Sequence, residues 1–125
     1  MAVANTAITP TIKRIRSFSS LPQNWDSYGA QPLSPVAIAT VDHILVQSLR
    51  LPIYDDCAVV DAVPSPDGGV LVEWESQSSR FQLRVHADGT MAGVRIDTEN
   101  GKSVAWKDVP VATDGDVLDQ LNRLV

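Results

Sequence analysis

The spacing of hydrophobic residues changes once along this sequence. Before residue 52 the apolar residues recur every three to four positions, and after Cys57 they alternate with polar residues. The first spacing predicts amphipathic helices, and the second predicts half-buried strands. The pattern therefore predicts helices first and strands afterwards.

Three segments carry helix signals. Thr9–Pro10 and Ser34–Pro35 each place a capping residue before a proline at the first helical position, and they predict helices over residues 10–20 and 35–50. Residues 113–116 supply a cap and acidic first-turn residues for a third helix near the C-terminus. The apolar stripes of the three helices are Ile8, Ile12, Ile15 and Phe18; Ile38, Val41, Leu45 and Leu49; and Val117, Leu118, Leu121 and Leu124.

Three dipeptides divide the second half of the chain into strands. Asp67-Gly68, Asp88-Gly89 and Asn100-Gly101 tolerate the positive φ angles of tight hairpins. Connections this short force neighbouring strands to be antiparallel, because a parallel crossover needs a dozen or more residues. The predicted strands cover residues 58–63, 69–75, 80–86, 91–98 and 102–106.

Together these elements predict an α+β fold. It is an antiparallel meander of about five strands, with two N-terminal helices and one C-terminal helix packed on one face. We expect residues 1–125 to form a single domain in which residues 1–8 are flexible.

Alternation within the strands predicts which side chains face the helices. We assign inward positions to the apolar residues and outward positions to the polar ones, which gives a polar outer face. The inward set is Val70, Val72, Trp74, Phe81, Leu83, Val85, Val94, Ile96, Val104 and Trp106, and the outward set is Glu73, Gln82, Arg84, His86, Arg95 and Lys107.

Composition and charge narrow the classes of function. A hydrophobic content of 44% is typical of a folded domain, and the net charge of −5 disfavours a general nucleic-acid binder, which needs a basic face. The basic cluster of Lys13, Arg14 and Arg16 is interpreted as a solvated helix face. We expect a cytoplasmic protein, in a bacterial host or an infected cell, because the sequence shows no secretory signal and no membrane-spanning apolar run.

Two segments resemble a known sequence pattern. They are Asn24-Trp25-Asp26-Ser27-Tyr28-Gly29-Ala30 and the later run Pro66-Asp67-Gly68-Gly69 that ends in Glu73-Trp74. The chain resembles a family of small, uncharacterised bacterial and phage proteins that carry N-W-D-G/S-Y-G-A followed by P-D-G-G-x-x-x-E-W. The resemblance covers roughly residues 20–75. It implies a bacterial or phage source and a compact domain, and it brings no activity and no catalytic residue.

The segment 24–30 is the richest in candidate binding residues. In a structural interpretation Trp25 fills the core, Asp26 accepts backbone hydrogen bonds in an Asx-type turn, and Gly29 supplies a positive φ. In a functional interpretation Trp25, Asp26 and Tyr28 form a recognition site, because aromatic residues are favoured anchors at interfaces.

Other candidate chemistry is sparse. Asp55, Asp56 and Asp61 gather near the start of the first strand and form either a solvated acidic rim or a surface that meets a basic partner. His43 and His86 lack the partners of a metal site, and acidic neighbours disfavour a thiolate at Cys57. We therefore predict no catalytic residue, no metal and no cofactor.

The preferred hypothesis is a non-enzymatic protein-binding module. It would act as an antitoxin, immunity protein, inhibitor or accessory subunit, through the segment 24–30, the acidic rim or the edge strand 58–63. One alternative is a small hydrolase-like or nuclease-like enzyme that uses Asp26, Tyr28, His43 and Asp61. The other is a self-associating structural protein, such as a homodimer paired through an edge strand.

Overall fold

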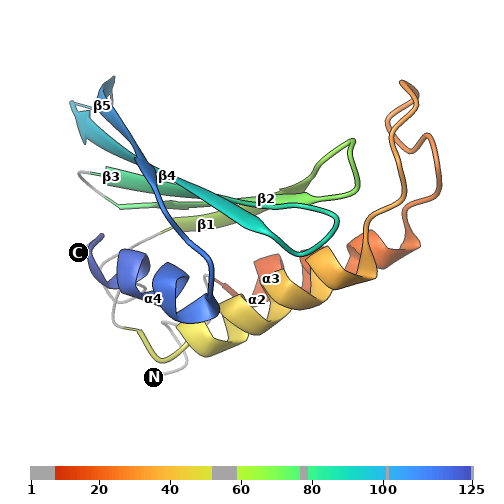
Figure 1. The fold of residues 1–125 in the computed structure, drawn as a ribbon, viewed down its shortest axis with the longest axis horizontal. Coiled ribbons are helices and arrows are strands. Elements are labelled where there is room, and N and C mark those ends of the chain that lie inside the picture. The colour runs from red at the N-terminus through yellow and green to blue at the C-terminus, as the bar shows by residue number, and fades with distance from the viewer. Residues whose placement is uncertain (1–7, 52–58, 77–78, 101, 125) are drawn as a thin grey trace.

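The computed structural model describes residues 8–51, 59–76, 79–100 and 102–124. The helical elements lie together below the sheet in Figure 1. They are α2 (Thr9–Ser17), the short 3-10 helix η1 (Phe18–Ser20), α3 (Pro35–Ser48) and α4 (Asp114–Asn122). The strands are β1 (Val59–Pro64), β2 (Val70–Glu75), β3 (Ser79–Val85), β4 (Met91–Glu99) and β5 (Lys102–Val109).

The sheet is an antiparallel meander in the order β1-β2-β3-β4-β5. The helices cover one of its faces and leave the other bare (Figure 1). The predicted α+β fold, with two N-terminal helices and one C-terminal helix, is confirmed. The prediction placed the end of the last strand at Trp106, whereas β5 continues to Val109.

Helix starts follow the capping signals in two of three cases. Ser34 Oγ accepts a hydrogen bond from the backbone N–H of Ala37, as the Ser-Pro signal predicts. Thr113 and Asp116 form a reciprocal capping box at the start of α4. The third start is one residue earlier than predicted, since α2 begins at Thr9 and its cap is Ile8, which is fully buried.

The core lies between the helices and strands β1 to β3. Trp74 and Phe81 are cross-strand partners, and their rings stack with centroids 5.9 Å apart. Burial of each such side chain contributes about 1.5–3 kcal/mol, which makes this layer the main source of stability. The fully buried apolar residues include Ile8, Ile15, Val41, Ile44, Leu45, Val70, Val72, Trp74, Leu83, Val85, Val117 and Leu121.

The predicted facing of β4 and β5 is wrong. Phe81, whose side chain is in the core, lies opposite Arg95 in the sheet register, and Arg95 lies opposite Lys107. Opposed residues share a sheet face, so Arg95 and Lys107 point to the helix side. The alternate residues Val94, Ile96 and Trp106 therefore point to the bare side.

The turn between β3 and β4 explains this reversal. A two-residue turn at Asp88–Gly89 would pair Phe81 with Ile96 and bury the apolar set. The structure instead has a longer turn, closed by a hydrogen bond from His86 N–H to Thr90 O, in which Gly89 has φ +89°. The pairing moves by one residue, and a one-residue shift sends every side chain of a strand to the opposite face.

Candidate functional site

An apolar strip occupies the bare sheet face over the last two strands. We use this name for Val94, Ile96 and Trp106 together with Val104, an exposed residue of β5 at the bulge where the β4–β5 register shifts. Trp106 is 65% exposed and Val104 is 58% exposed, whereas Ile96 beside them is fully buried. A large exposed apolar residue is common singly, but neighbouring ones mark an interaction site.

Ile96 owes its burial to its cross-strand neighbours. Its partner on β3 is Arg80 and its partner on β5 is Trp106, so a long side chain flanks it on each side. The Arg80 Nε atom lies 3.2 Å from Glu75 Oε2, which draws the guanidinium toward β2. Trp106 thus shields Ile96 on one flank while most of its own surface stays in solvent.

β5 is the last strand of the sheet. Of its eight residues, seven are exposed and Val109 is half-buried. An edge strand presents backbone N–H and C=O groups that can pair with another chain. Within the described residues no further strand covers this edge. The apolar strip therefore borders a row of backbone groups that can accept a strand.

The helix side of the same edge carries three cationic side chains, of which Arg95 and Arg123 are paired with aspartates and Lys107 forms no ion pair with another described residue. A cavity of about 480 Å³, here called the basic cavity, lies between the β4–β5 hairpin and α4. Arg95 anchors it, because its Nη2 donates a 3.3 Å hydrogen bond to Arg123 O near the end of α4. The residues that line the basic cavity are Arg95, Asp97, Lys107, Asp108, Val109, Pro110, Gln120 and Arg123.

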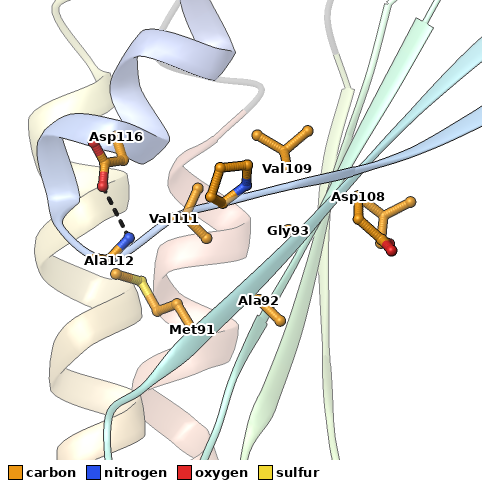
Figure 2. Close-up of a pocket in the computed structure, with 10 residues that line it drawn as sticks. Met91, Ala92, Gly93, Asp108, Val109, Val111, Ala112 and Asp116 are labelled. Carbon is orange, nitrogen blue, oxygen red and sulfur yellow. Dashed lines mark hydrogen bonds between the residues drawn. The ribbon is translucent and has the colours of Figure 1, made fainter.

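A second depression opens where the chain leaves the sheet. The pairing of β4 with β5 ends there at Gly93 and Val109, because the residue after Val109 is Pro110, which has no N–H to donate. The first residues of β4 therefore have no partner on β5. Figure 2 shows Met91, Val111 and Ala112 around this opening, with Asp116 hydrogen-bonded to Ala112 N–H. Its volume is about 680 Å³. The lining is mostly apolar, and its Asp116 carboxylate is engaged in the helix cap.

Segment 24–30 combines both predicted interpretations. Asp26 Oδ1 accepts hydrogen bonds from the N–H groups of Tyr28 and Ala30, and Gly29 has φ +86°, as the structural interpretation predicts. Trp25 is half-buried against the core, and its Nε1 donates to Gln31 O at 2.8 Å. Tyr28, by contrast, is 92% exposed.

The loop between segment 24–30 and α3 packs against the turn between β1 and β2. Gln31 N–H donates to Pro66 O at 2.9 Å, and Ser34 N–H donates to Gly68 O at 2.8 Å. The loop that follows Ala30 is therefore held by the β1–β2 turn.

Of the predicted acidic rim, only Asp61 lies within the described residues. Asp55 and Asp56 lie outside the described residues. Asp61 is exposed on β1, opposite Glu73, and its Oδ1 lies 3.9 Å from Arg14 Nη1. Asp61 and Glu73 line a shallow depression of about 160 Å³ together with Val63 and Leu71. Asp61 is thus a solvated carboxylate near an arginine, whereas Glu73 is half-buried and accepts a 2.6 Å hydrogen bond from Gln82 Nε2.

The residues proposed for an enzyme lie apart. Asp26 and Tyr28 are in the loop before α3, whereas Asp61 is on β1. His43 Nε2 lies 3.2 Å from Asp114 Oδ2, on the exposed surface where α3 meets α4. Neither His43 nor Asp114 lines the cavities described above. The pair therefore ties two helices together.

Other candidate chemistry is equally limited. His86 sits at the turn between β3 and β4, and Cys57 is outside the described part of the chain. Among the residues that the structure describes, no three His, Cys, Asp or Glu side chains are grouped to hold a metal ion.

Among the described residues, the carboxyl groups of three aspartates have lowered pKa values, each because of a local turn or cap. Hydrogen bonds from Ala112 N–H and then Thr113 N–H lower the pKa of Asp116. The Ser65 side chain and then the Gly69 N–H lower the pKa of Asp67, and the Thr90 side chain and N–H lower that of Asp88. All three aspartates stabilise backbone geometry.

The residues that sequence reasoning missed are those of the β5 edge. Trp106 and Val104 were assigned to the core because they are apolar and alternate. The signal that could have found them is the length of the β3–β4 turn, which sets the face of every residue after it.

Comparison with known proteins adds no assignment. No family model, no curated protein and no solved structure matches this chain. Within the described ranges, no helix has the length and apolar character needed to cross a bilayer.

Proposed function

We propose that this protein is a non-enzymatic protein-binding module whose contact surface is the β5 edge with its apolar strip. In this role it would act in the cytoplasm on another protein, as an inhibitor, antitoxin, immunity protein or accessory subunit does. The observation that carries the proposal is the exposure of Trp106 and Val104 beside the buried Ile96 on a sheet face without helices.

The energetics favour a binding role for this tryptophan. Tryptophan is among the residues that contribute most at protein interfaces, because it buries a large area with little loss of conformational freedom. In the free protein most of the surface of Trp106 is exposed to solvent. A partner that covers it recovers the burial energy that folding leaves unused.

Photocrosslinking from two single sites tests the proposal. The photoreactive amino acid p-benzoylphenylalanine, which keeps a large aromatic side chain at the site, replaces Trp106 in one variant and Val46 in the other, and each variant is irradiated in its host cells. Val46 is the matched control, since it is 43% exposed and lies on α3, away from the bare sheet face. We expect a discrete crosslinked product from position 106 that mass spectrometry identifies as one partner.

Competition completes the experiment. An excess of unlabelled wild-type protein should abolish the crosslink, and an excess of the Trp106→Ala variant should not. Equal products from positions 106 and 46, or no product from position 106, would show that the apolar strip is not a contact surface.

A further inference from the structure

We propose that the partner contributes an extended segment that pairs with β5 and alternates apolar with acidic side chains. This inference rests on the proposed protein-binding function and specifies the chemistry of the partner. It assigns the apolar side chains to the bare face of the sheet and the acidic ones to the basic cavity.

Backbone pairing is the first element of the inference. Strand addition uses the main-chain groups of an exposed edge for affinity and the alternating side chains for specificity. β5 offers such an edge over eight residues, most of them exposed. Pro110 ends it, because a proline cannot donate to an added strand.

The preference for apolar side chains in the partner comes from the bare face of the sheet. A strand added beside β5 lies about 4.8 Å from it, so the side chains on its outer face reach Trp106. Valine or isoleucine at those positions would bury the indole ring and extend the apolar strip by one strand.

The preference for acidic side chains in the partner comes from the face of the sheet that the helices cover. Lys107 and Arg95 are cross-strand partners there, and Arg123, the residue after α4, lines the same cavity. Asp97 lies 3.5 Å from Arg95 Nε, and Asp119 pairs with Arg123 at 3.1 Å. Lys107, next to the open edge, is the cation that an added strand meets first, and a glutamate opposite it would complement its charge.

Charge also argues against a second copy of this chain as the occupant. Two β5 strands paired about a two-fold axis perpendicular to the sheet place both helix faces on the same side of the seam. Lys107 of each copy would then lie on the same side of one seam, whereas Arg95 is one strand away and is paired with Asp97. Such like-charge contacts disfavour self-association, whereas an acidic segment relieves them.

The test is an NMR titration of the isotopically labelled full chain. The probe is a synthetic peptide as long as β5, 8 residues, in which valine alternates with glutamate. We expect shifts in the β5 amides and in the indole N–H of Trp106. The indoles of Trp25 and Trp74 are internal controls, because one is hydrogen-bonded to Gln31 and the other is fully buried.

Variants of the peptide separate the components of the contact. Lysine in place of glutamate should weaken binding about ten-fold, since it turns attraction into repulsion. N-methylation of the peptide backbone along one edge should abolish binding, because it removes the donors of the ladder. A peptide of the same composition with valines and glutamates in two blocks should also fail to bind.

Variants of the protein test the assigned residues. Lys107→Glu should weaken binding of the glutamate peptide about three- to ten-fold, in the range of surface charge contacts. Lys13→Glu makes the same change of charge on the exposed side of α2 and should leave affinity unchanged. Trp106→Ala should weaken binding about ten-fold or more, as loss of an interface anchor does.

The outcomes distinguish this inference from the proposed function. A crosslinked partner at position 106, without any shift from the alternating peptide, would overturn strand addition and leave the protein-binding function standing. Equal affinity for the lysine and glutamate peptides would overturn the acidic assignment. Concentration-dependent dimerisation that Trp106→Ala abolishes would show that a second copy occupies the edge and would also overturn the inference.

Discussion

Gly93 of β4 lies directly beneath the ring of Phe81. A Cβ atom built on Gly93 would stand 3.0 Å from Phe81 Cε1 and 3.1 Å from Cζ, and 3.2 Å from the carbonyl oxygen of Val109. The ring rests on a glycine because no side chain fits between it and the strand. This contact fixes the place of β4 under the core layer.

Gly93→Ala should therefore lower the free energy of unfolding by about 1–3 kcal/mol, the cost of overpacking a filled core. Urea denaturation measures it. Gly115→Ala is the matched control: the nearest atom to its new Cβ is Thr113 Oγ1 at 3.6 Å, so the helix should keep or gain stability. Combining Gly93→Ala with Phe81→Leu should restore part of the loss. Additive losses would mean that the two positions are not in contact.

Truncation of the tryptophans at positions 74 and 106 should cost very different amounts of stability. Trp74→Ala should cost about 3–5 kcal/mol, because the side chain is fully buried. Trp106→Ala should cost about 1 kcal/mol or less, since most of the ring is in solvent. Thermal or urea unfolding of both variants compares them. A large loss for Trp106→Ala would place that ring in the interior and remove the basis of the binding surface.

The Asx-type turn should be a local stabiliser. Asp26→Ala deletes the acceptor for two backbone N–H groups, so we expect a loss of about 1–2 kcal/mol. Asp26→Asn keeps an oxygen in the same place and should lose less. Tyr28→Ala should change stability by no more than about 0.5 kcal/mol, since that side chain is exposed. Equal losses for the two Asp26 variants would show that charge, not the acceptor, matters.

Acid should weaken the start of α4. The pKa of Asp116 is lowered from its ordinary value of 3.8 by the Ala112 and Thr113 N–H groups. A lowered pKa in the folded state gives stability that is fully present above 3.8 and lost as the pH falls through the folded value. The stability difference between wild type and Asp116→Asn should therefore shrink on acidification below 3.8. A difference that stays constant with pH would mean that the carboxylate's charge has no part in the cap.

Sequence patterns predicted the elements more reliably than their orientation. The caps at Ser34 and Thr113 were readable because a short polar side chain before a helix has one local use. The face of β4 was not readable from hydrophobicity, since it depends on whether the β3–β4 turn holds two residues or three, and Asp88-Gly89 fits both lengths.

The candidate site was harder to predict for the same reason. Trp25, Asp26 and Tyr28 were singled out from composition, and the structure gives two of them structural contacts and exposes the third. Trp106 and Lys107 were assigned to the wrong faces, so the contrast between an apolar and a basic side of β5 could not be seen beforehand. That contrast depends on register, which is a long-range property of the sheet.

The contact between α3 and α4 has a consequence for synthesis of the chain on the ribosome. The whole meander lies between these helices in the sequence, yet their side chains share one core. Each hairpin can form as soon as its two strands leave the exit tunnel, because its partners are adjacent in sequence. The part of α3 that packs on α4 must wait until α4 has been translated, whereas the parts that pack on α2, β2 and β3 need not. The nascent protein therefore carries an unfinished, chaperone-accessible surface until α4 emerges.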